Sequence, residues 1–135
     1  MKFIPAKISD IETLAVLNKR LIEDEGYPNP MTVEQLAERM IGWLQTEYRS
    51  YLGMIGDRIA AYCLYRDDVK YYYLRHLYVD REFRQQGIAT QLLDWMYANI
   101  WIDKKVRLDV LIHNERAIAF YEQYGFKTRV LRMEK

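Results

Sequence analysis

The sequence is poor in the side chains that form disulfides and metal sites. Its 135 residues include 1 cysteine, Cys63, and 2 histidines. A single thiol cannot form an intramolecular disulfide, and so few Cys and His residues exclude a Cys-cluster zinc site. We therefore expect no bound metal. Cys63 lies in a β-rich run with no histidine nearby in sequence, which favours a buried structural thiol over a nucleophile.

Charge of one sign and long apolar runs are also missing. With 20 Lys and Arg against 19 Asp and Glu, the net charge is +1, whereas a whole-surface nucleic-acid binder needs many cations to replace counterions. No stretch approaches the ~18 apolar residues that span a bilayer. Residues 1–10 contain no apolar block of the kind found in signal peptides. We expect a cytoplasmic protein with no nucleic-acid partner and no membrane partner.

Aromatic residues are abundant instead. The chain has 12 Tyr, 3 Trp and 4 Phe, and 50% of its residues are hydrophobic, a composition that excludes intrinsic disorder. Domains most often run ~100–150 residues, and the sequence contains no internal repeat, low-complexity tract or linker. These properties predict a single domain over residues 1–135.

The first half of the chain carries two helix-start signals. Residues 9–12 (Ser-Asp-Ile-Glu) and 32–35 (Thr-Val-Glu-Gln) are capping boxes, in which the outer two side chains satisfy backbone amides at a helix N-terminus. They predict one helix that ends near Gly26 and a second that ends at about Tyr48. Before them, a mixed run at 3–8 contains a proline and so predicts an edge strand.

The second half alternates strands and helices. Two β-rich runs at 51–55 and 59–65 flank Gly56-Asp57, which predicts a tight hairpin. A hairpin followed by strand–helix–strand units predicts a mixed sheet with helices on both faces. The later elements are predicted to be a Tyr-rich strand at 69–79, a helix at 88–100, a strand at 106–112, a helix between Asn114 and Gly125, and a final strand at 126–133.

The turn after the Tyr-rich strand has the features of an anion site. A polar stretch follows Val79, and a helix opens on Gly87. The first amides of a helix have no internal partner and lie at the positive end of its dipole, where phosphate binds. Gly87 lets a ligand approach the backbone, and Arg84 and Arg81 add positive charge. On spacing alone, a strand-to-helix loop with solvated arginines explains the segment equally well.

A second motif follows downstream of this turn: a strand with Leu108-Asp109-Val110, then Asn114, Ala117, Phe120-Tyr121 and Tyr124-Gly125-Phe126. Together the two motifs resemble the GNAT superfamily of acetyl-CoA-dependent N-acetyltransferases. The resemblance implies an α/β GNAT-like fold with a mixed, mostly antiparallel sheet of about six to seven strands, splayed between 69–79 and 106–112, and about four flanking helices. The residues that match the family are Leu77-Tyr78-Val79, Arg84 to Ala89, Asn114, Ala117, Phe120-Tyr121 and Gly125-Phe126.

The resemblance implies a coenzyme site. The amides of the loop would hold the diphosphate, and the pantetheine arm would enter the gap between the splayed strands. Asn114 would contact that arm, while Ala117 and Phe120 would line the channel. The full set of implied coenzyme contacts is Leu77, Tyr78, Val79, Arg84, Gln85, Gln86, Gly87, Ile88, Ala89, Thr90, Asn114, Ala117, Phe120 and Tyr121.

The resemblance also implies the chemistry. The enzyme would transfer an acetyl group directly from acetyl-CoA to a primary amine, with the amide of Leu77 polarising the thioester carbonyl and Tyr121 protonating the leaving thiolate. Without the family match, Tyr121 is better interpreted as a core tyrosine. The acids Glu23, Asp24 and Glu25 at a helix end oppose the helix dipole, and they favour a small cationic acceptor. A homodimer is compatible with the family.

Several residues could accept the proton of the amine. Many GNAT enzymes carry a Glu four residues before the oxyanion amide, a position that Tyr73 occupies here. His76 is an alternative, although strand alternation places it on the face opposite Leu77 and Tyr73. Asp109 and the acidic helix end are further candidates. The missing Glu leaves open a second function, a non-catalytic acyl-CoA sensor or assembly module with the same fold.

Overall fold

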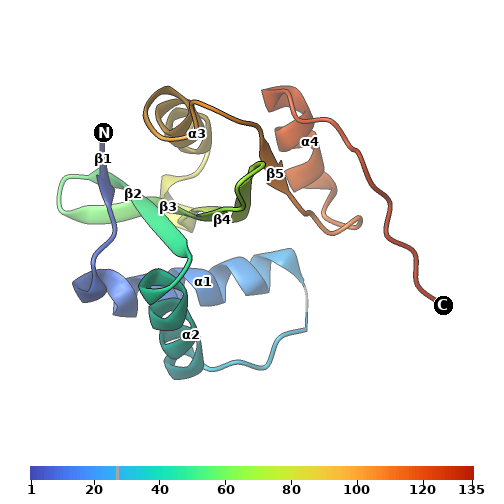
Figure 1. Ribbon diagram of the computed structural model, residues 1–135. Coiled ribbons are helices and arrows are strands. Elements are labelled where there is room, and N and C mark those ends of the chain that lie inside the picture. Colours follow the sequence, from blue (N-terminus) through green and yellow to red (C-terminus); the bar gives the residue numbers. More distant parts are fainter. Residues whose placement is uncertain (27) are drawn as a thin grey trace.

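A computed structural model describes residues 1–26 and 28–135 and shows one sheet with helices on both faces (Figure 1). The sheet has five strands in the order β1-β2-β3-β4-β5, fewer than the predicted six to seven. None of the helices within these ranges is long and apolar enough to cross a membrane. The elements are β1 (Lys2–Pro5), η1 (Ile8–Asp10), α1 (Ile11–Glu25), α2 (Val33–Gln45), β2 (Tyr48–Ile55), β3 (Arg58–Asp67), β4 (Tyr72–Val79), η2 (Arg81–Phe83), α3 (Ile88–Asn99), β5 (Val106–Leu108) and α4 (Glu115–Tyr124).

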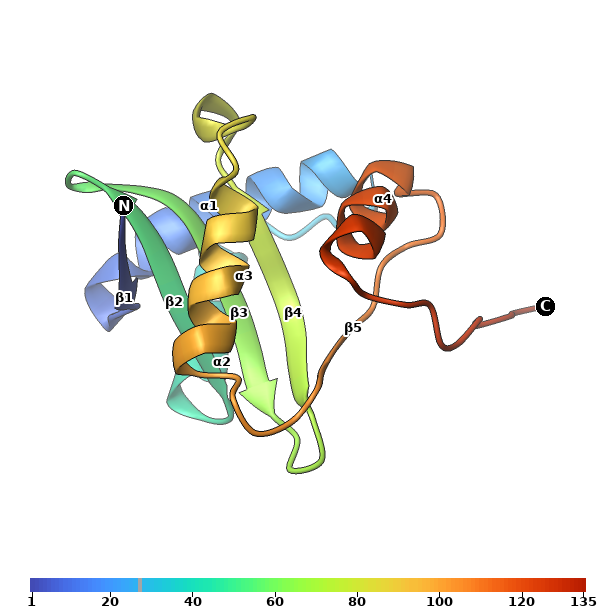
Figure 2. The same ribbon diagram turned by 90° about the horizontal axis from the view of Figure 1, so that it is seen from above.

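The sheet opens between β4 and β5. Neighbouring strands from β1 to β4 are antiparallel, whereas β4 and β5 are parallel. The parallel pairing is confined to residues 72–74 of β4 against Val106–Leu108. Beyond it the two strands diverge, and Figure 2 shows β5 leading away from β4 toward α4. The predicted splay is confirmed. β5 is shorter than the predicted run at 106–112 because only its first 3 residues pair with β4.

Side chains of β3 alternate between two cores. Cys63 and Tyr65 belong to the core covered by α3, whereas Tyr62 and Leu64 belong to the core covered by α1 and α2, as the two-residue period of a strand requires. Cys63 is fully buried, and burial raises the pKa of its thiol to about 12. The predicted structural role of this thiol is therefore confirmed. The α3 face and the α1/α2 face lie on opposite sides of the sheet (Figure 1).

β4 contains a bulge at Arg75. The register with β3 pairs Leu64 with His76 and then Tyr65 with Leu74, so that Arg75 is an extra residue on β4. A bulge bends its strand and increases the local twist. The bend follows directly after the last position of β4 that pairs with β5, and it helps the two strands diverge.

The bulge corrects one expectation about strand faces. Unbroken alternation places Tyr73 with Leu77 and opposite His76. In the structure Tyr73 lies 4.7 Å beneath the guanidinium of Arg66, and His76 lies 5.6 Å from the ring of Trp43 on α2. Both side chains therefore lie on the α1/α2 face, whereas Leu77 packs against the α3 core. The extra residue shifts the alternation by one position, which sequence alone does not reveal.

The second predicted capping box forms, and the first does not. Thr32 accepts a hydrogen bond from the Gln35 amide at 3.2 Å, and the Gln35 side chain accepts one from the Thr32 amide at 2.9 Å. At the first site the chain makes a 3-10 turn, in which the Asp10 carboxylate accepts from the Lys7 amide at 2.8 Å. Helix α1 begins at Ile11 because Asp10, rather than the preceding serine, closes the turn.

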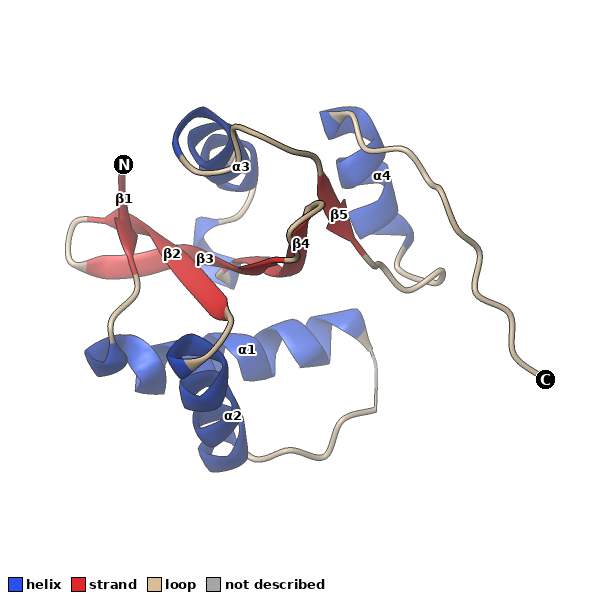
Figure 3. Ribbon diagram, viewed as in Figure 1, coloured by secondary structure: helices blue, strands red, loops and turns tan. Residues whose placement is uncertain are grey.

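The C-terminal segment does not form the predicted final strand. The amide of Phe126 donates to the carbonyl of Tyr121 at 2.9 Å, and that of Gly125 to Glu122 at 3.1 Å, the Schellman pattern that ends helices at glycine. Beyond it the chain runs away from the sheet (Figures 1 and 3). The prediction of a strand at 126–133 is wrong because no strand among the described residues pairs with it.

Candidate active site

The open edge of β4 presents backbone groups to the gap. The amide of Asp80 donates to the carbonyl of Ala60 at 2.8 Å, and bonded and non-bonded pairs alternate along an antiparallel ladder. Leu77 therefore belongs to a non-bonded pair with β3, and its amide and carbonyl point toward the gap. The carbonyl of Val79 points the same way and accepts from Nε of Arg84 at 3.1 Å. No described strand pairs with the amide of Leu77 on this side, because β5 pairs only with residues 72–74 of β4.

The loop before α3 is built from left-handed turns. Gln85 has φ +63° and Gly87 has φ +72°, a region that non-glycine residues rarely adopt. A Cβ added to Gly87 would meet no described atom within 4 Å, so the space above it is open. α3 begins at Ile88 without a side-chain cap, which leaves its first amides free to bind an anion. The Ile88 side chain is buried in the α3 core, so only its backbone faces this space.

The arginines of the loop bind the end of α1. Arg81 and Arg84 both donate to the carboxylate of Asp24, and Arg81 also reaches Glu23 at 3.5 Å. Although burial alone would raise it, these hydrogen bonds hold the pKa of Asp24 below its usual value. The acidic helix end, interpreted from the sequence as attraction for a cationic acceptor, is thus explained in part by two arginines. Glu25 is the acid of the trio that these arginines do not bind.

Asp80 anchors the start of the loop, and the sequence analysis missed it. Its side chain is buried and accepts from the amide of Arg81 at 2.9 Å. Both of its carboxylate oxygens also accept from the guanidinium of Arg20 on α1, at 2.9 and 3.0 Å. Both hydrogen bonds come from Nη1 of Arg20, and this charge-assisted contact ties the end of β4 to α1. An aspartate directly after a strand is a frequent helix cap, and that signal could have identified it.

α4 begins at a side-chain cap. Oδ1 of Asn114 accepts from the amide of Ala117 at 3.3 Å, as the sequence predicted for a helix N-cap. This bond occupies the Oδ1 atom of Asn114 and leaves its NH2 group for other contacts. Phe120 packs against the α3 core. Because residues three apart share a helix face, Ala117 lies beside Phe120 on the side of α4 that faces the sheet.

Tyr121 lies among aromatic rings on α4. Its ring centroid is 5.4 Å from that of Phe120 and 5.6 Å from that of Phe126, both in edge-to-face geometry. Burial raises the pKa of Tyr121 well above its usual value, and the charge of Glu25 adds to this. The phenol therefore stays protonated at neutral pH, which is the state that a proton donor needs.

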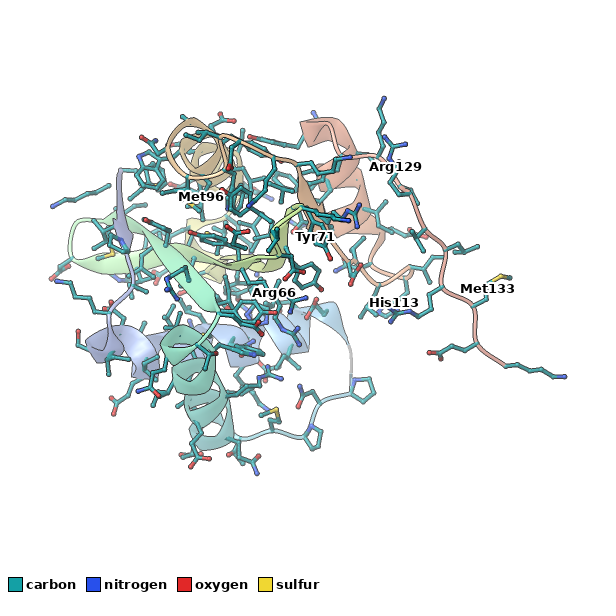
Figure 4. All side chains as sticks on the ribbon, in the orientation of Figure 1. Arg66, Tyr71, Met96, His113, Arg129 and Met133 are labelled. Atoms are coloured by element: carbon teal, nitrogen blue, oxygen red, sulfur yellow. The ribbon has the colours of Figure 1, made fainter. Side chains whose placement is uncertain are left out.

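Glu25 lies where the end of α1 meets α4. Nε2 of His113 donates to the backbone carbonyl of Glu25 at 3.0 Å, and Figure 4 shows His113 below α4. Burial raises the pKa of the Glu25 carboxyl, and His113 opposes the shift. A carboxylate whose pKa is raised can accept a proton nearer neutral pH than a solvated one. Among the acids of the helix end, Glu25 is the one whose charge raises the pKa of Tyr121.

Tyr73 and Asp109 form a hydrogen-bonded pair. The hydroxyl of Tyr73 donates to Oδ2 of Asp109 at 3.0 Å, and burial together with the Asp109 charge raises the pKa of Tyr73 to about 12. At the position where the resemblance calls for Glu, a phenol thus reaches a carboxylate on the segment after β5. Tyr73 is four residues from Leu77, ~13 Å along an extended strand. The pair lies toward the closed end of the gap.

His76 is a packing residue rather than a base. It is 8% exposed, and its Nδ1 lies 3.0 Å from the hydroxyl of Tyr62. Burial lowers the pKa of His76 to about 3, with further contributions from the charges of Arg75 and Arg39. A general base works best with a pKa near the operating pH. A neutral, hydrogen-bonded imidazole on the α1/α2 face does not meet that need.

The buried His76 predicts a loss of stability in acid. The pKa of His76 is 6.5 in the unfolded chain and about 3 in the folded protein. The folded protein therefore has its full stability above pH 6.5 and loses stability as the pH drops below that value. We expect a loss of about 2 kcal/mol from this group between pH 7 and pH 5. Urea unfolding at both values measures it. His76→Gln does not titrate, so an equally large loss in that variant would contradict the assignment.

Solved structures share this fold. A protein from Clostridium difficile 630, described as a possible acetyltransferase, has a TM-score of 0.85 and 22% identity, covering 99% of this chain and 95% of that one. A predicted acetyltransferase from Clostridium acetobutylicum, solved with acetyl-CoA, has a TM-score of 0.75 and 20% identity, covering 99% and 94%. The fold of the chain is thus the one that these acetyltransferases adopt.

Sequence comparisons place the chain in a family. Residues 46–128 match the model of the acetyltransferase (GNAT) domain. The N-alpha-acetyltransferase of Saccharolobus solfataricus is 26% identical over 137 residues, which cover 90% of this chain and 77% of that protein. The chain belongs to the GNAT acetyltransferase family, and it is an acyltransferase.

Proposed function

We propose that the chain transfers an acetyl group from acetyl-CoA to a primary amine of a small molecule that arrives as an ammonium ion. The observation that carries this proposal is the gap beside β4, where the free amide of Leu77 follows the divergence of β5. Two helices flank this gap. One is α3, whose first amides are uncapped, and the other is α4, which carries the protonated phenol of Tyr121. The acetyl-CoA in the Clostridium acetobutylicum structure supports the choice of co-substrate.

The coenzyme binds in this proposal through backbone groups more than through side chains. The amides at the start of α3 hold its diphosphate above Gly87. The NH2 group of Asn114 contacts the pantetheine arm, and Ala117 and Phe120 line the channel. Tyr78 contributes its backbone alone, because its ring is buried in the α1/α2 core. The other coenzyme contacts that we propose are Leu77, Val79, Arg84, Gln85, Gln86, Ile88, Ala89, Thr90 and Tyr121.

The chemistry is a direct transfer. The ammonium loses a proton toward the carboxylate of Glu25, directly or through one water, and its nitrogen attacks the thioester carbon. The amide of Leu77 donates to the carbonyl oxygen as negative charge develops there, a contact typically worth ~3–4 kcal/mol. The C–S bond then breaks, and the hydroxyl of Tyr121 protonates the departing thiolate. The second proton of the attacking nitrogen is lost as the amide forms and passes through water to the Tyr121 oxygen, which restores the phenol. The products are an N-acetylated amine and free coenzyme A, and no acyl-enzyme forms.

A thiol-release screen tests the function. Purified protein is incubated with acetyl-CoA and a panel of amines, including polyamines, aminoglycosides and amino acids, and free thiol is measured. Calorimetry with acetyl-CoA is run in parallel, because coenzyme binding and turnover together distinguish an acetyltransferase from a non-catalytic acyl-CoA sensor. Turnover of at least one amine supports the acetyltransferase, whereas tight coenzyme binding without turnover of any amine would favour the acyl-CoA sensor.

Replacing Glu25 by Gln should weaken the binding of the acceptor and leave the binding of acetyl-CoA unchanged. The neutral amide can neither pair with an ammonium nor take its proton. We therefore expect the acceptor KM to rise by about 10-fold, the low end for a charge-assisted hydrogen bond, and kcat to fall by about 100-fold or more. The same loss should appear in the wild type as the pH falls through the pKa of Glu25, which burial raises. Steady-state kinetics measures both. Glu23→Gln, which removes an exposed acid two residues away, is the control and should leave the acceptor KM unchanged.

A further inference from the structure

The guanidiniums of two arginines lie against the ring of one tryptophan on the α1/α2 face of the sheet. Arg39 and Trp43 lie one turn apart on α2, and the guanidinium of Arg39 is 4.5 Å from the centre of the Trp43 ring. Arg75, the bulged residue of β4, places its guanidinium 4.7 Å from a centre of the same ring. Residues four apart share a helix face, and the bulge turns Arg75 toward them. We call Arg39, Trp43 and Arg75 the arginine site.

No carboxylate neutralises these two arginines. Within residues 1–26 and 28–135, neither Arg39 nor Arg75 forms an ion pair. Two acids on adjoining segments are already engaged, Asp68 with Arg66 at 2.8 Å and Asp109 with a tyrosine hydroxyl. Burial, together with the charge of Arg75, holds the pKa of Arg39 below its usual value. Two like charges held close together without an acid favour the binding of an anion.

Buried polar groups beside the arginine site also lack partners. Asn18 on α1 is fully buried, and its Oδ1 accepts from Arg39 at 3.4 Å. Nδ2 of Asn18 and Nε of Arg39 are buried, and neither has a hydrogen-bond partner in the described part of the chain. Buried donors are almost always satisfied in folded proteins, because an unmade bond leaves the full cost of desolvation. These two orphaned donors therefore point to a ligand with acceptor oxygens.

The arginine site lies close to the groups that we assign to the reaction. Arg75 is two residues before Leu77, ~7 Å along an extended strand. Asn18 and Glu25 are seven residues apart on α1, which places them on the same helix face and ~10 Å apart along the axis. A small molecule with its amine near Glu25 and Leu77 can thus extend toward Arg75.

We propose that the arginine site binds a carboxylate carried by the acceptor itself. The acceptor is then an amino-acid-like molecule, with its amine beside Glu25 and its carboxylate between Arg39 and Arg75. This inference rests on the proposed acetyltransfer. A planar carboxylate matches the fork of a guanidinium, and Nδ2 of Asn18 supplies one more donor.

Binding of an acid without a free amine tests the carboxylate site independently of catalysis. Labelled protein is titrated with N-acetylalanine and with its uncharged amide, and the side-chain signals of Arg39 and Asn18 are followed by NMR. We expect the acid alone to shift them, and Arg75→Gln to weaken its binding by about 10- to 100-fold. Arg49→Gln, an exposed arginine on β2, should bind as the wild type does. Equal binding of acid and amide, unchanged binding in Arg75→Gln, or tighter binding of inorganic phosphate than of the acid would overturn the proposal.

Turnover separates the failure of this site from the failure of the proposed function. Amino acids and their amides are compared as acceptors in matched pairs. Arg75→Gln should raise the KM of the acids by about 10- to 100-fold, while leaving the KM of acetyl-CoA unchanged. Specific binding of N-acetylalanine without turnover of any amine would keep the carboxylate site and remove the acetyltransferase. If the enzyme instead acetylates the amides as efficiently as the acids, the acetyltransferase stands and the carboxylate site is wrong.

Discussion

Replacing Tyr121 by Phe is expected to lower kcat by about 100- to 1,000-fold, which is within the usual contribution of a general acid. The ring stays packed between Phe120 and Phe126, so the fold and the coenzyme channel survive and only the proton donor is lost. Calorimetry with acetyl-CoA should therefore give a Kd close to that of the wild type. Thiol release under saturating acceptor measures the loss of turnover.

Tyr124→Phe provides the matched control for this experiment. Tyr124 lies three residues further along α4, and its hydroxyl donates to Asp94 at 2.7 Å, on α3. Its removal deletes the same atom from the same helix without touching the gap. If Tyr121→Phe acetylates at the wild-type rate, or if both variants lose turnover equally, then Tyr121 does not protonate the leaving thiolate.

Replacing Gly87 by Ala is expected to weaken acetyl-CoA binding by about 10- to 100-fold. The new Cβ would occupy the open space above the start of α3, where the diphosphate must approach, and the loss of one charge-assisted hydrogen bond there accounts for a change of this size. The φ of +72° also strains the variant, by about 1–2 kcal/mol. Calorimetry measures the Kd, and urea unfolding measures the strain.

Gly56→Ala separates strain from contact with the coenzyme. Gly56 forms the tip of the β2–β3 hairpin with φ +62°, and a Cβ there would also meet no described atom within 4 Å. The two variants should lose similar stability, but only Gly87→Ala should lose affinity for acetyl-CoA. Equal affinities for the coenzyme in both variants would place the diphosphate elsewhere.

Local signals allowed the sequence to predict most of the helices and turns. The box at 32–35, the hairpin at Gly56-Asp57 and the cap at Asn114 each act within four residues, so the information that sets them is contiguous. The helix ends at Gly87 and Gly125 could also be predicted, because glycine adopts the positive φ values of +72° and +121° that these positions require.

Contacts between distant segments could not be predicted in the same way. Asp24 meets Arg81 and Arg84 across 57 and 60 positions, and an acidic helix end does not reveal its partner. The face of Tyr73 depends on the register between β3 and β4, which one strand does not encode. The run at 126–133 has the composition of a strand, but composition cannot show whether a neighbouring strand is within reach of the same chain.

Because Arg75 is the extra residue of a bulge, its side chain can be substituted without altering which face of the sheet its neighbours occupy. If Arg75 were absent, regular alternation would still place Leu74 on the α3 face and His76 on the α1/α2 face, where they lie now. The position therefore bends β4 by its presence as one additional backbone unit, and its side chain is exposed and contacts only the edge of the α1/α2 core, at Trp43 and Tyr48. With the acceptor carboxylate bound as we propose, substitutions at this insertion would redirect acceptor preference at the cost of these two contacts alone.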